Sequence, residues 1–248
     1  MPDLSYPADG RTGGGYLAVP GGVAPGTAPG GTGREAAGGP WPGVIVIHEI
    51  FGLTADVRRH ADRFASAGYL AFAPDLFGGR SWMRCVRGAI GQLRAGSGPA
   101  FTLIEAARAW LASREDCTGR TGVIGFCMGG GFALLCAPRD GFAVVSVNYG
   151  DVPEDAEHVL SGACPVVGSY GAKDPMGVKP PERLERALTA LGVPHDIKVY
   201  PGAGHRFMSR TSPALAPLAG LARMGYKEDA AEDSWRRILA FFGEHLRR

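Results

Sequence analysis

Short apolar runs alternate with segments of helical spacing along most of this chain. The runs have the length of strands and occupy residues 44–48, 69–73, 121–126, 142–147, 165–169 and 196–200. Capping residues and apolar positions three and four apart predict helices over 54–67, 101–114, 129–137, 154–160, 181–191 and 228–246. Strands too apolar to have a wet face, regularly separated by helices, predict an α/β fold with a mostly parallel central sheet and helices on both faces.

The first 43 residues follow a different pattern. The stretch 10–43 holds about a third of the 39 glycines, many prolines and one short strand candidate at 16–19. We therefore expect 1–43 to be a peripheral strand with a flexible Gly/Pro-rich loop, and 44–248 to be a single α/β domain. The stretch that follows Asp75 has no clear periodicity and is expected to be irregular.

Cys127 lies at the centre of Gly125-Phe126-Cys127-Met128-Gly129, where the strand 121–126 meets the helix 129–137. This is the nucleophile-elbow pattern of α/β-hydrolases, with a thiol in place of the usual hydroxyl. A tight strand-to-helix turn forces the nucleophile into strained geometry, so bulky flanking residues would collide. A cysteine is otherwise most often a small buried hydrophobe, but the strand, the helix and downstream acid and histidine residues favour acyl-transfer chemistry here.

A base and an acid follow at later strand ends. His205 lies in a glycine-rich turn just past the strand 196–200, and Asp174 comes shortly after the strand 165–169. The order nucleophile, acid, histidine is that of α/β-hydrolases, so the predicted triad is Cys127, Asp174 and His205. An imidazole would take the thiol proton while a carboxylate fixes the ring tautomer. Asp151, just past the strand 142–147, is the alternative acid.

Composition excludes several classes of partner. A formal net charge of +2, with scattered arginines, does not predict nucleic-acid binding. No apolar run approaches the roughly 18 residues of a membrane helix, and the start of the chain lacks a signal-peptide pattern, so a cytoplasmic protein is expected. The five cysteines form no C-x-x-C pair and no His/Cys cluster at zinc spacing, so we expect neither a metal nor a disulfide framework.

Five segments together resemble the dienelactone hydrolase family. They occur in the family's order and approximate spacing, and they are His48-Glu49-Ile50-Phe51-Gly52, Pro74-Asp75-Leu76-Phe77, Gly125-Phe126-Cys127-Met128-Gly129-Gly130, Gly171-Ala172-Lys173-Asp174 and Gly202-Ala203-Gly204-His205. The resemblance implies an α/β-hydrolase fold with a Cys-Asp-His triad. It also implies that Glu49 hydrogen-bonds the nucleophilic thiol and keeps the thiol unreactive until substrate binds. Composition alone would make Glu49 a solvated charge.

The activity implied is that of carboxymethylenebutenolidase, a small-molecule ester or lactone hydrolase that needs no cofactor. A thioester acyl-enzyme would form at Cys127, and the backbone N–H groups of Ile50 and Met128 would hold the oxyanion. Two alternatives are a general carboxylesterase or thioesterase for uncharged substrates and a non-catalytic thiol-sensing protein on the same scaffold.

Substrate recognition follows the family less closely. In the family one arginine after the Pro-Asp-Leu-aromatic segment and another after the catalytic histidine hold the substrate carboxylate. Arg80 and Arg210 are each displaced by one residue from those positions, and misplacement weakens bidentate recognition. The other candidates are Arg84, Arg87 and Arg206 for the carboxylate, and Phe51, Trp82 and Phe207 for apolar walls of the pocket.

Overall fold

The computed structural model describes residues 4–8, 10–21, 39–175, 179–210 and 225–247. Two compact units divide the chain, Met1–Val123 and Ile124–Arg248. Most of the Gly/Pro-rich loop expected within 1–43 lies outside the described residues. The assignment of 44–248 to one domain stays a prediction.

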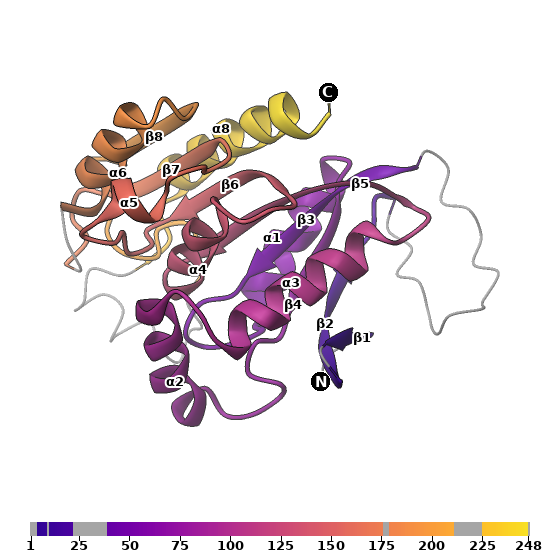
Figure 1. Cartoon of the computed structure of the whole chain (residues 1–248). Helices are drawn as coiled ribbons and strands as arrows, with labels where there is room; N and C mark the ends of the chain where they lie inside the picture. Colours follow the sequence, from indigo (N-terminus) through magenta and orange to yellow (C-terminus); the bar gives the residue numbers. More distant parts are fainter. Residues whose placement is uncertain (1–3, 9, 22–38, 176–178, 211–224, 248) are drawn as a thin grey trace. The chain divides into compact units, whose positions relative to one another are not determined.

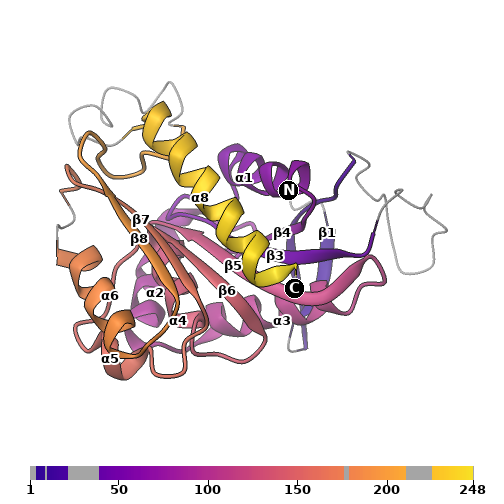
Figure 2. The ribbon, with the colours of Figure 1, turned by 90° about the horizontal axis from the view of Figure 1, so that it is seen from above.

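The first unit contains both parallel and antiparallel strands. Its described elements are, in order, β1 (Leu4–Ala8), β2 (Arg11–Ala18), β3 (Trp41–Ile47), α1 (Ala55–Ser66), β4 (Leu70–Pro74), α2 (Trp82–Ala95) and α3 (Pro99–Ala112) (Figure 1). The strands lie in the order β1-β2-β4-β3, with β3 parallel to β4 and β2 antiparallel to both of its neighbours. Figure 2 shows α1 and α3 on opposite faces of β3 and β4. Both faces of these strands are therefore covered, which explains their continuous apolar runs.

Helix α1 begins and ends where the sequence predicts. The Thr54 hydroxyl accepts a hydrogen bond from the Val57 N–H at 3.5 Å, and Gly68 follows the helix with φ 85°. Val57, Ala61 and Phe64 are buried at helical spacing. The cap satisfies a free N–H group of the first turn, and glycine adopts the positive φ without a steric penalty.

The amino-terminal residues form more structure than the sequence predicts. In place of one short strand at 16–19, β1 and β2 form an antiparallel hairpin, and β2 contains three consecutive glycines. A Cβ at Gly13 would lie 2.5 Å from the Tyr6 ring, and a Cβ at Gly15 would lie 2.4 Å from the Phe72 ring. The aromatic rings thus occupy the space that side chains on β2 would need, which is why a strand of low apolar content packs here.

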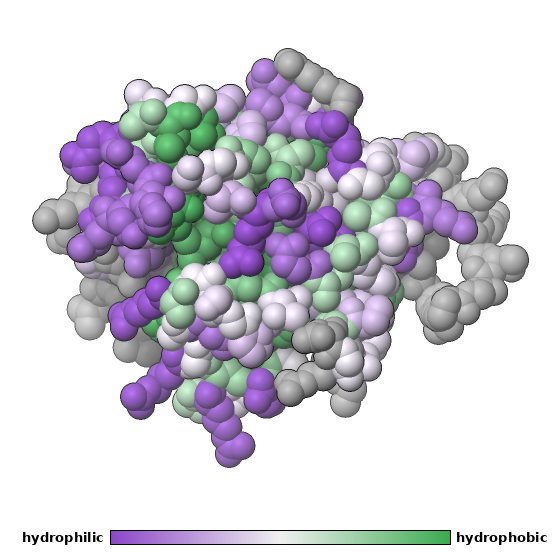
Figure 3. All heavy atoms as spheres, viewed as in Figure 1, coloured by the Kyte–Doolittle hydropathy of each residue, from purple (hydrophilic) through white to green (hydrophobic). Residues whose placement is uncertain are grey.

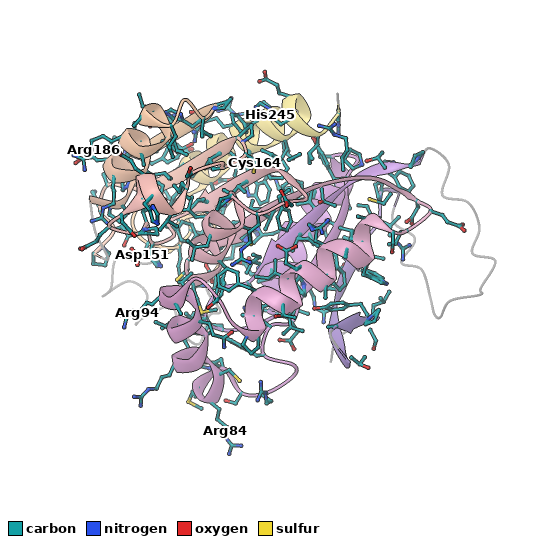
Figure 4. All side chains as sticks on the ribbon, viewed as in Figure 1. Arg84, Arg94, Asp151, Cys164, Arg186 and His245 are labelled. Carbon is teal, nitrogen blue, oxygen red and sulfur yellow. The ribbon has the colours of Figure 1, made fainter. Side chains whose placement is uncertain are left out.

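The expectation that the stretch after Asp75 is irregular is wrong for Trp82–Ala95, which is helix α2. Ala89 is the only residue of this helix that is buried. Hydrophilic side chains project from the region of α2 in Figure 3, and Arg84 and Arg94 extend away from the helix in Figure 4. A helix that buries so little has a weak apolar period, which accounts for the failed prediction.

Strand β5 (Cys117–Phe126) begins in the first unit and ends in the second. The described elements that follow are α4 (Met128–Cys136), β6 (Phe142–Asn148), α5 (Ala156–Val159), β7 (Val166–Gly171), α6 (Lys179–Ala190), β8 (His195–Tyr200) and α8 (Glu228–Leu246). Strands β6, β7 and β8 are parallel, with α8 on one face and α4 and α6 on the other (Figure 2). The predicted α/β class, with mostly parallel strands and helices on both faces, is confirmed.

Arg237 of helix α8 makes hydrogen bonds to both β7 and β8. The Arg237 guanidinium donates to the Asp196 carboxylate at 2.9 Å, the Asp196 carbonyl at 2.8 Å, the Gly168 carbonyl at 3.3 Å and the Ser169 hydroxyl at 3.3 Å. Its side chain is 14% exposed. Burial opposes the charge, but the bonds to Asp196 and Tyr200 outweigh burial and raise the pKa of Arg237 above its usual value. The arginine stays charged and fixes the helix over the strand ends that precede the site.

Candidate active site

Cys127 lies at a strained turn between β5 and α4. The residue is the N-cap of α4, with φ 55° and ψ −121°, and it is one of the few described non-glycine residues with positive φ. A Cβ at Gly125 would lie 1.8 Å from the Gly129 carbonyl oxygen. No side chain fits there, so the glycine two positions before the cysteine is a steric requirement of the turn, as the sequence pattern predicts.

The elbow is also fixed by the end of β6, which the sequence did not identify. The Cys127 N–H donates to the Asn148 carbonyl at 3.0 Å, and the Asn148 side-chain amide donates to the Gly125 carbonyl at 3.1 Å. Asn148 thereby holds the backbone on both sides of Phe126. The available signal was a polar residue at the end of an otherwise apolar strand, followed by an aromatic residue and a glycine.

Asp174 and His205 are brought together by two loops that hydrogen-bond to each other. The Lys173 N–H donates to the Ala203 carbonyl at 2.8 Å, and the Ala172 N–H donates to the Tyr200 carbonyl at 3.0 Å. His205 Nδ1 then lies 2.7 Å from Asp174 Oδ2. Both side chains are buried. The carboxylate accepts the Nδ1 proton, which fixes the ring orientation and leaves Nε2 for chemistry.

The alternative acid, Asp151, has a different environment. Asp151 is exposed, and its carboxylate accepts a hydrogen bond from the Val152 N–H at 2.9 Å. Figure 4 labels this residue in the segment after β6. A carboxylate that bonds its neighbouring N–H forms a local turn. Asp174 is therefore the acid that contacts His205.

The charge of His205 depends on two opposing influences. Burial disfavours the charged ring, but the hydrogen bond with Asp174 and the interactions with Cys127 outweigh burial and raise the pKa of His205 from 6.5 to about 10. The other ring nitrogen, Nε2, is buried and makes no hydrogen bond of standard geometry within the described part of the chain. A buried polar atom without a partner is costly, and such atoms are concentrated where a substrate or water completes the site.

Two backbone N–H groups at the sequence-predicted oxyanion positions remain available. Met128 is the first residue of α4, so its N–H has no carbonyl partner within the helix. Among the described residues, neither the Met128 N–H nor the Ile50 N–H donates a hydrogen bond. Free donors at a helix start favour negative charge.

In the first unit, His48 holds together the loops that follow β3 and β4. The Leu76 N–H donates to His48 Nε2 at 3.1 Å, so the other nitrogen, Nδ1, carries the proton and donates to the Glu49 carbonyl at 2.7 Å. Complete burial lowers the pKa of His48 and keeps the ring neutral. The His48 ring packs against Phe77, with ring centroids 4.8 Å apart. Glu49 is itself buried, not a solvated charge.

The same two loops line a pocket of about 200 Å³. Its lining residues are Phe51, Gly52, Leu53, Arg58, Asp75, Phe77, Gly79 and Arg80. Asp75 accepts hydrogen bonds from the Phe77 and Gly79 N–H groups, at 2.9 and 2.6 Å, so its charge is used in folding the loop. Arg80 donates through Nε to the Phe77 carbonyl at 3.1 Å, and its two Nη groups bond no residue in the described part of the chain. Of the sequence-predicted recognition residues, the pocket includes Phe51 and Arg80.

The remaining predicted recognition residues lie elsewhere. Arg84 and Arg87 are exposed on α2. The Arg210 guanidinium lies over the Tyr226 ring, 5.0 Å from its centroid. Phe207 is fully buried between Tyr149 and Tyr200 in ring contacts of 5.6 and 5.2 Å, so it packs in the interior of the second unit.

Trp82 and Arg206 are the last two of the predicted recognition residues. The Trp82 ring is 38% exposed and meets the edge of Phe51 at 5.4 Å, which places it beside a pocket-lining residue. Arg206 is buried directly after His205 and has φ 62°.

Two further properties concern metals and membranes. The described residues contain no group of three or more His, Cys, Asp or Glu side chains arranged to hold a metal ion. No helix among them combines the length and the apolar character needed to cross a membrane.

Comparison with known proteins gives a consistent result. The family model described as "Dienelactone hydrolase family" matches residues 31–246. A Salmonella typhimurium protein named "Putative carboxymethylenebutenolidase" is 30% identical over 227 residues, which cover 85% of this chain and 80% of the relative. The Rhodococcus opacus protein named carboxymethylenebutenolidase is 28% identical over 224 residues, covering 82% of this chain and 81% of that protein.

A solved structure resembles the whole chain. The crystal structure titled "Putative Dienelactone Hydrolase" from Klebsiella pneumoniae has 27% sequence identity and a TM-score of 0.76, and the match covers 97% of each chain. The fold is therefore that of the α/β-hydrolases, and the molecule is a hydrolase that acts on ester or lactone bonds. The chain belongs to the dienelactone hydrolase family.

Proposed function

We propose that this hydrolase cleaves its ester or lactone substrate through a Cys127 nucleophile, with His205 as acid and base and Asp174 as the residue that orients the imidazole. The observation that carries the proposal is the 2.7 Å hydrogen bond between His205 Nδ1 and Asp174, which leaves Nε2 of the same ring buried and without a bonded partner in the described chain. The strained backbone of Cys127 supports it, because such strain is concentrated at functional sites.

In the first half of the reaction, the Cys127 thiolate attacks the carbonyl carbon and forms a C–S bond while the carbonyl oxygen becomes an oxyanion. The C–O bond then breaks, and His205 donates its Nε2 proton to the leaving oxygen. In a lactone this oxygen stays attached to the same molecule. In the second half, His205 takes a proton from water and the hydroxide attacks the thioester carbon. The C–S bond then breaks, the carboxylic acid leaves, and the Cys127 thiolate and the protonated His205 are restored.

Two backbone groups stabilise the oxyanion in this proposal. They are the N–H groups of Met128 and Ile50, which bond no other described residue. Donors already oriented toward the developing charge need no reorganisation during the reaction, and losing one typically costs about 3 kcal/mol of transition-state stabilisation. Neither a metal nor a cofactor is required by these steps.

Two further assignments extend the proposal to thiol control and to the substrate class. We assign to Glu49 the control of thiol reactivity that the family resemblance implies, and to Arg80 the recognition of a substrate carboxylate. In this pocket the Arg80 guanidinium, whose Nη groups bond no described residue, lines the same cavity as the aromatic rings of Phe51 and Phe77. A flat, conjugated lactone that carries a carboxylate matches both features. The exposed position of Arg84, the Tyr226 contact of Arg210 and the burial of Phe207 favour Arg80 and Phe51 for this role.

The test compares hydrolysis of a carboxylated dienelactone and a neutral aryl ester by the wild type and Cys127→Ala. We expect the variant to lose both activities while keeping the wild-type unfolding temperature. Cys164→Ala is the matched control, because burial raises the pKa of that thiol to about 12 and it lies outside the proposed site. Full activity of Cys127→Ala would exclude the mechanism.

Glu49→Gln should speed alkylation of Cys127, and an alkylation rate that is unchanged across pH would remove Glu49 from the proposal.

A further inference from the structure

Tyr149 has an unusual backbone for a buried aromatic residue. It directly follows β6, has φ 43° and is 4% exposed. Positive φ is disfavoured for a bulky residue, and such a conformation persists only where the surroundings impose it. Glycine stands at the next position, Gly150, where a Cβ would lie 2.5 Å from the Gly130 carbonyl carbon. The chain therefore keeps a tyrosine at a position where glycine would cost less.

The tyrosine side chain contacts the turn that carries His205. Its ring meets the His205 imidazole edge to face, with centroids 5.2 Å apart and an interplanar angle of 65°. Its hydroxyl lies 2.8 Å from the Ser209 hydroxyl, at the far end of the same turn. The ring also packs against Phe207 at 5.6 Å. The turn 205–209 is thus held at its first, third and fifth residues by one side chain.

The backbone beside Tyr149 contacts the other two parts of the site. The preceding carbonyl, that of Asn148, accepts the Cys127 N–H at 3.0 Å. The Tyr149 N–H donates to the Ser169 carbonyl at 2.8 Å, in the strand that leads to the Asp174 loop. One short segment at the end of β6 is therefore connected to the nucleophile, the acid loop and the histidine.

A second constraint on the imidazole is needed because one hydrogen bond does not fix a ring. The bond to Asp174 holds Nδ1, but small rotations about the Cα–Cβ and Cβ–Cγ bonds can still tilt the ring about that contact and move Nε2 away from the sulfur. Nε2 makes no hydrogen bond of standard geometry with a described residue, although Cys127 favours its charged form. The edge-to-face contact with Tyr149 opposes this rotation, since aromatic pairs have preferred geometries.

We propose that Tyr149 is the positioning residue that keeps His205 aligned between Asp174 and Cys127, anchored at its hydroxyl by Ser209. This inference rests on the proposed function of those three residues. In this proposal Tyr149 acts on the imidazole and not on the substrate, so its loss affects the chemical step and leaves substrate binding intact. A displacement of about 1 Å at a reacting group lowers a rate by about 100-fold.

The test uses three variants of the full chain. Tyr149→Leu retains a Cβ and hence the same backbone strain but removes the aromatic edge; we expect kcat to fall about 10- to 100-fold with KM within about twofold. Tyr149→Phe and Ser209→Ala break the same hydroxyl contact from opposite sides. They should give equal, smaller losses of kcat, and the double variant should lose no more than either one.

A spectroscopic readout separates positioning from packing. NMR titration of the His205 ring should give a lower pKa in Tyr149→Leu than in the wild type, because the cooperation of Cys127 and Asp174 is weakened. A folded Tyr149→Leu with wild-type kcat and wild-type His205 titration would overturn the proposal. If that variant does not fold, wild-type kcat in both Tyr149→Phe and Ser209→Ala would overturn it instead. Hydrolysis retained by Cys127→Ala would reject the proposed triad. An inactive Cys127→Ala together with a fully active Tyr149→Leu would instead keep the triad and reject the role of Tyr149.

Discussion

The His205 imidazole is the residue whose charge most directly links the site to pH. Its pKa in the folded protein is raised from 6.5 to about 10 by Asp174 and Cys127, in spite of burial. The ring is therefore protonated at neutral pH and carries the proton that, in the proposed mechanism, passes to the leaving oxygen.

The raised pKa also predicts how stability depends on pH. A group whose pKa is higher in the folded state stabilises the fold fully below its unfolded pKa, near 6.5, and loses that contribution as the pH rises through about 10. The contribution is on the order of a few kcal/mol. Urea unfolding of the wild type and His205→Gln should show a stability difference at pH 6 that shrinks by pH 10.5. A difference independent of pH would contradict the raised pKa.

Residue-level geometry was predictable where the backbone imposes a pattern. The tight turn at Gly125 and Cys127 could be predicted because only glycine fits before it, and the pairing of His205 with Asp174 because both follow strands in a known order. Their roles in catalysis stay a prediction. Tyr149 carries no such pattern. Its proposed role depends on a positive φ and on a contact with a residue 56 positions later, and neither property can be read from local sequence.

The prediction for the elbow glycine follows from its lack of space. Gly125→Ala should cost about 3 kcal/mol or more in unfolding free energy, because the new methyl group would meet the Gly129 carbonyl at 1.8 Å. Gly91→Ala is the control: Gly91 lies inside α2, and no atom lies within 4 Å of the place that an alanine methyl would occupy, so alanine should stabilise by about 0.5 to 1 kcal/mol. Chemical denaturation of both variants measures whether each substitution lowers or raises the unfolding free energy. An unchanged unfolding free energy in Gly125→Ala would refute the steric argument.

At the scale of elements, helix α8 depends on Arg237. Its guanidinium satisfies two backbone carbonyls as well as the Asp196 carboxylate, so Arg237→Ala leaves several acceptors without a donor. We expect a loss of about 2 to 3 kcal/mol in unfolding free energy. The neighbouring Arg236 is 76% exposed and donates to the Asp233 carboxylate at 2.9 Å, so Arg236→Ala should cost less than about 1 kcal/mol. Equal losses in the two variants would show that the carbonyl contacts contribute nothing.

Most elements could be predicted because burial leaves a periodic pattern. The strands β3, β4, β6 and β7 and the buried end of β5 are apolar enough to be recognised without any tertiary information, and α1, α3 and α8 show clear helical spacing. Helix α2 could not be recognised, because only Ala89 is buried and two glycines interrupt the helix interior. The hairpin of β1 and β2 was missed because its strands gain apolar contact from Tyr6 and Phe72 and not from their own glycines.

At the scale of the whole molecule, substrate choice requires a site for the carbonyl and a site for the rest of the substrate. Arg80→Gln should lower kcat/KM for a carboxylated dienelactone about 10- to 100-fold, because a charged hydrogen bond is lost, and should leave a neutral aryl ester unaffected. Arg94→Gln, exposed on α2 and directed away from that helix, is the control (Figure 4). Equal losses of kcat/KM with both substrates would mean that Arg80 supports the loop and does not bind the substrate carboxylate.

The glycines of β2 have a consequence for the history of this family. The ring of Tyr6 fills the space above Gly13, so neither member of this pair is free to change alone. A larger residue at position 13 requires a smaller one at position 6. Position 15 needs glycine whatever residue stands at position 72, because a Cβ there would also lie 2.6 Å from the Ala73 carbonyl oxygen. Among relatives, substitutions at positions 6 and 13 should therefore arise together, and chimeras that join one lineage's β1 to another's β2 should fold poorly unless both partners of the pair are exchanged.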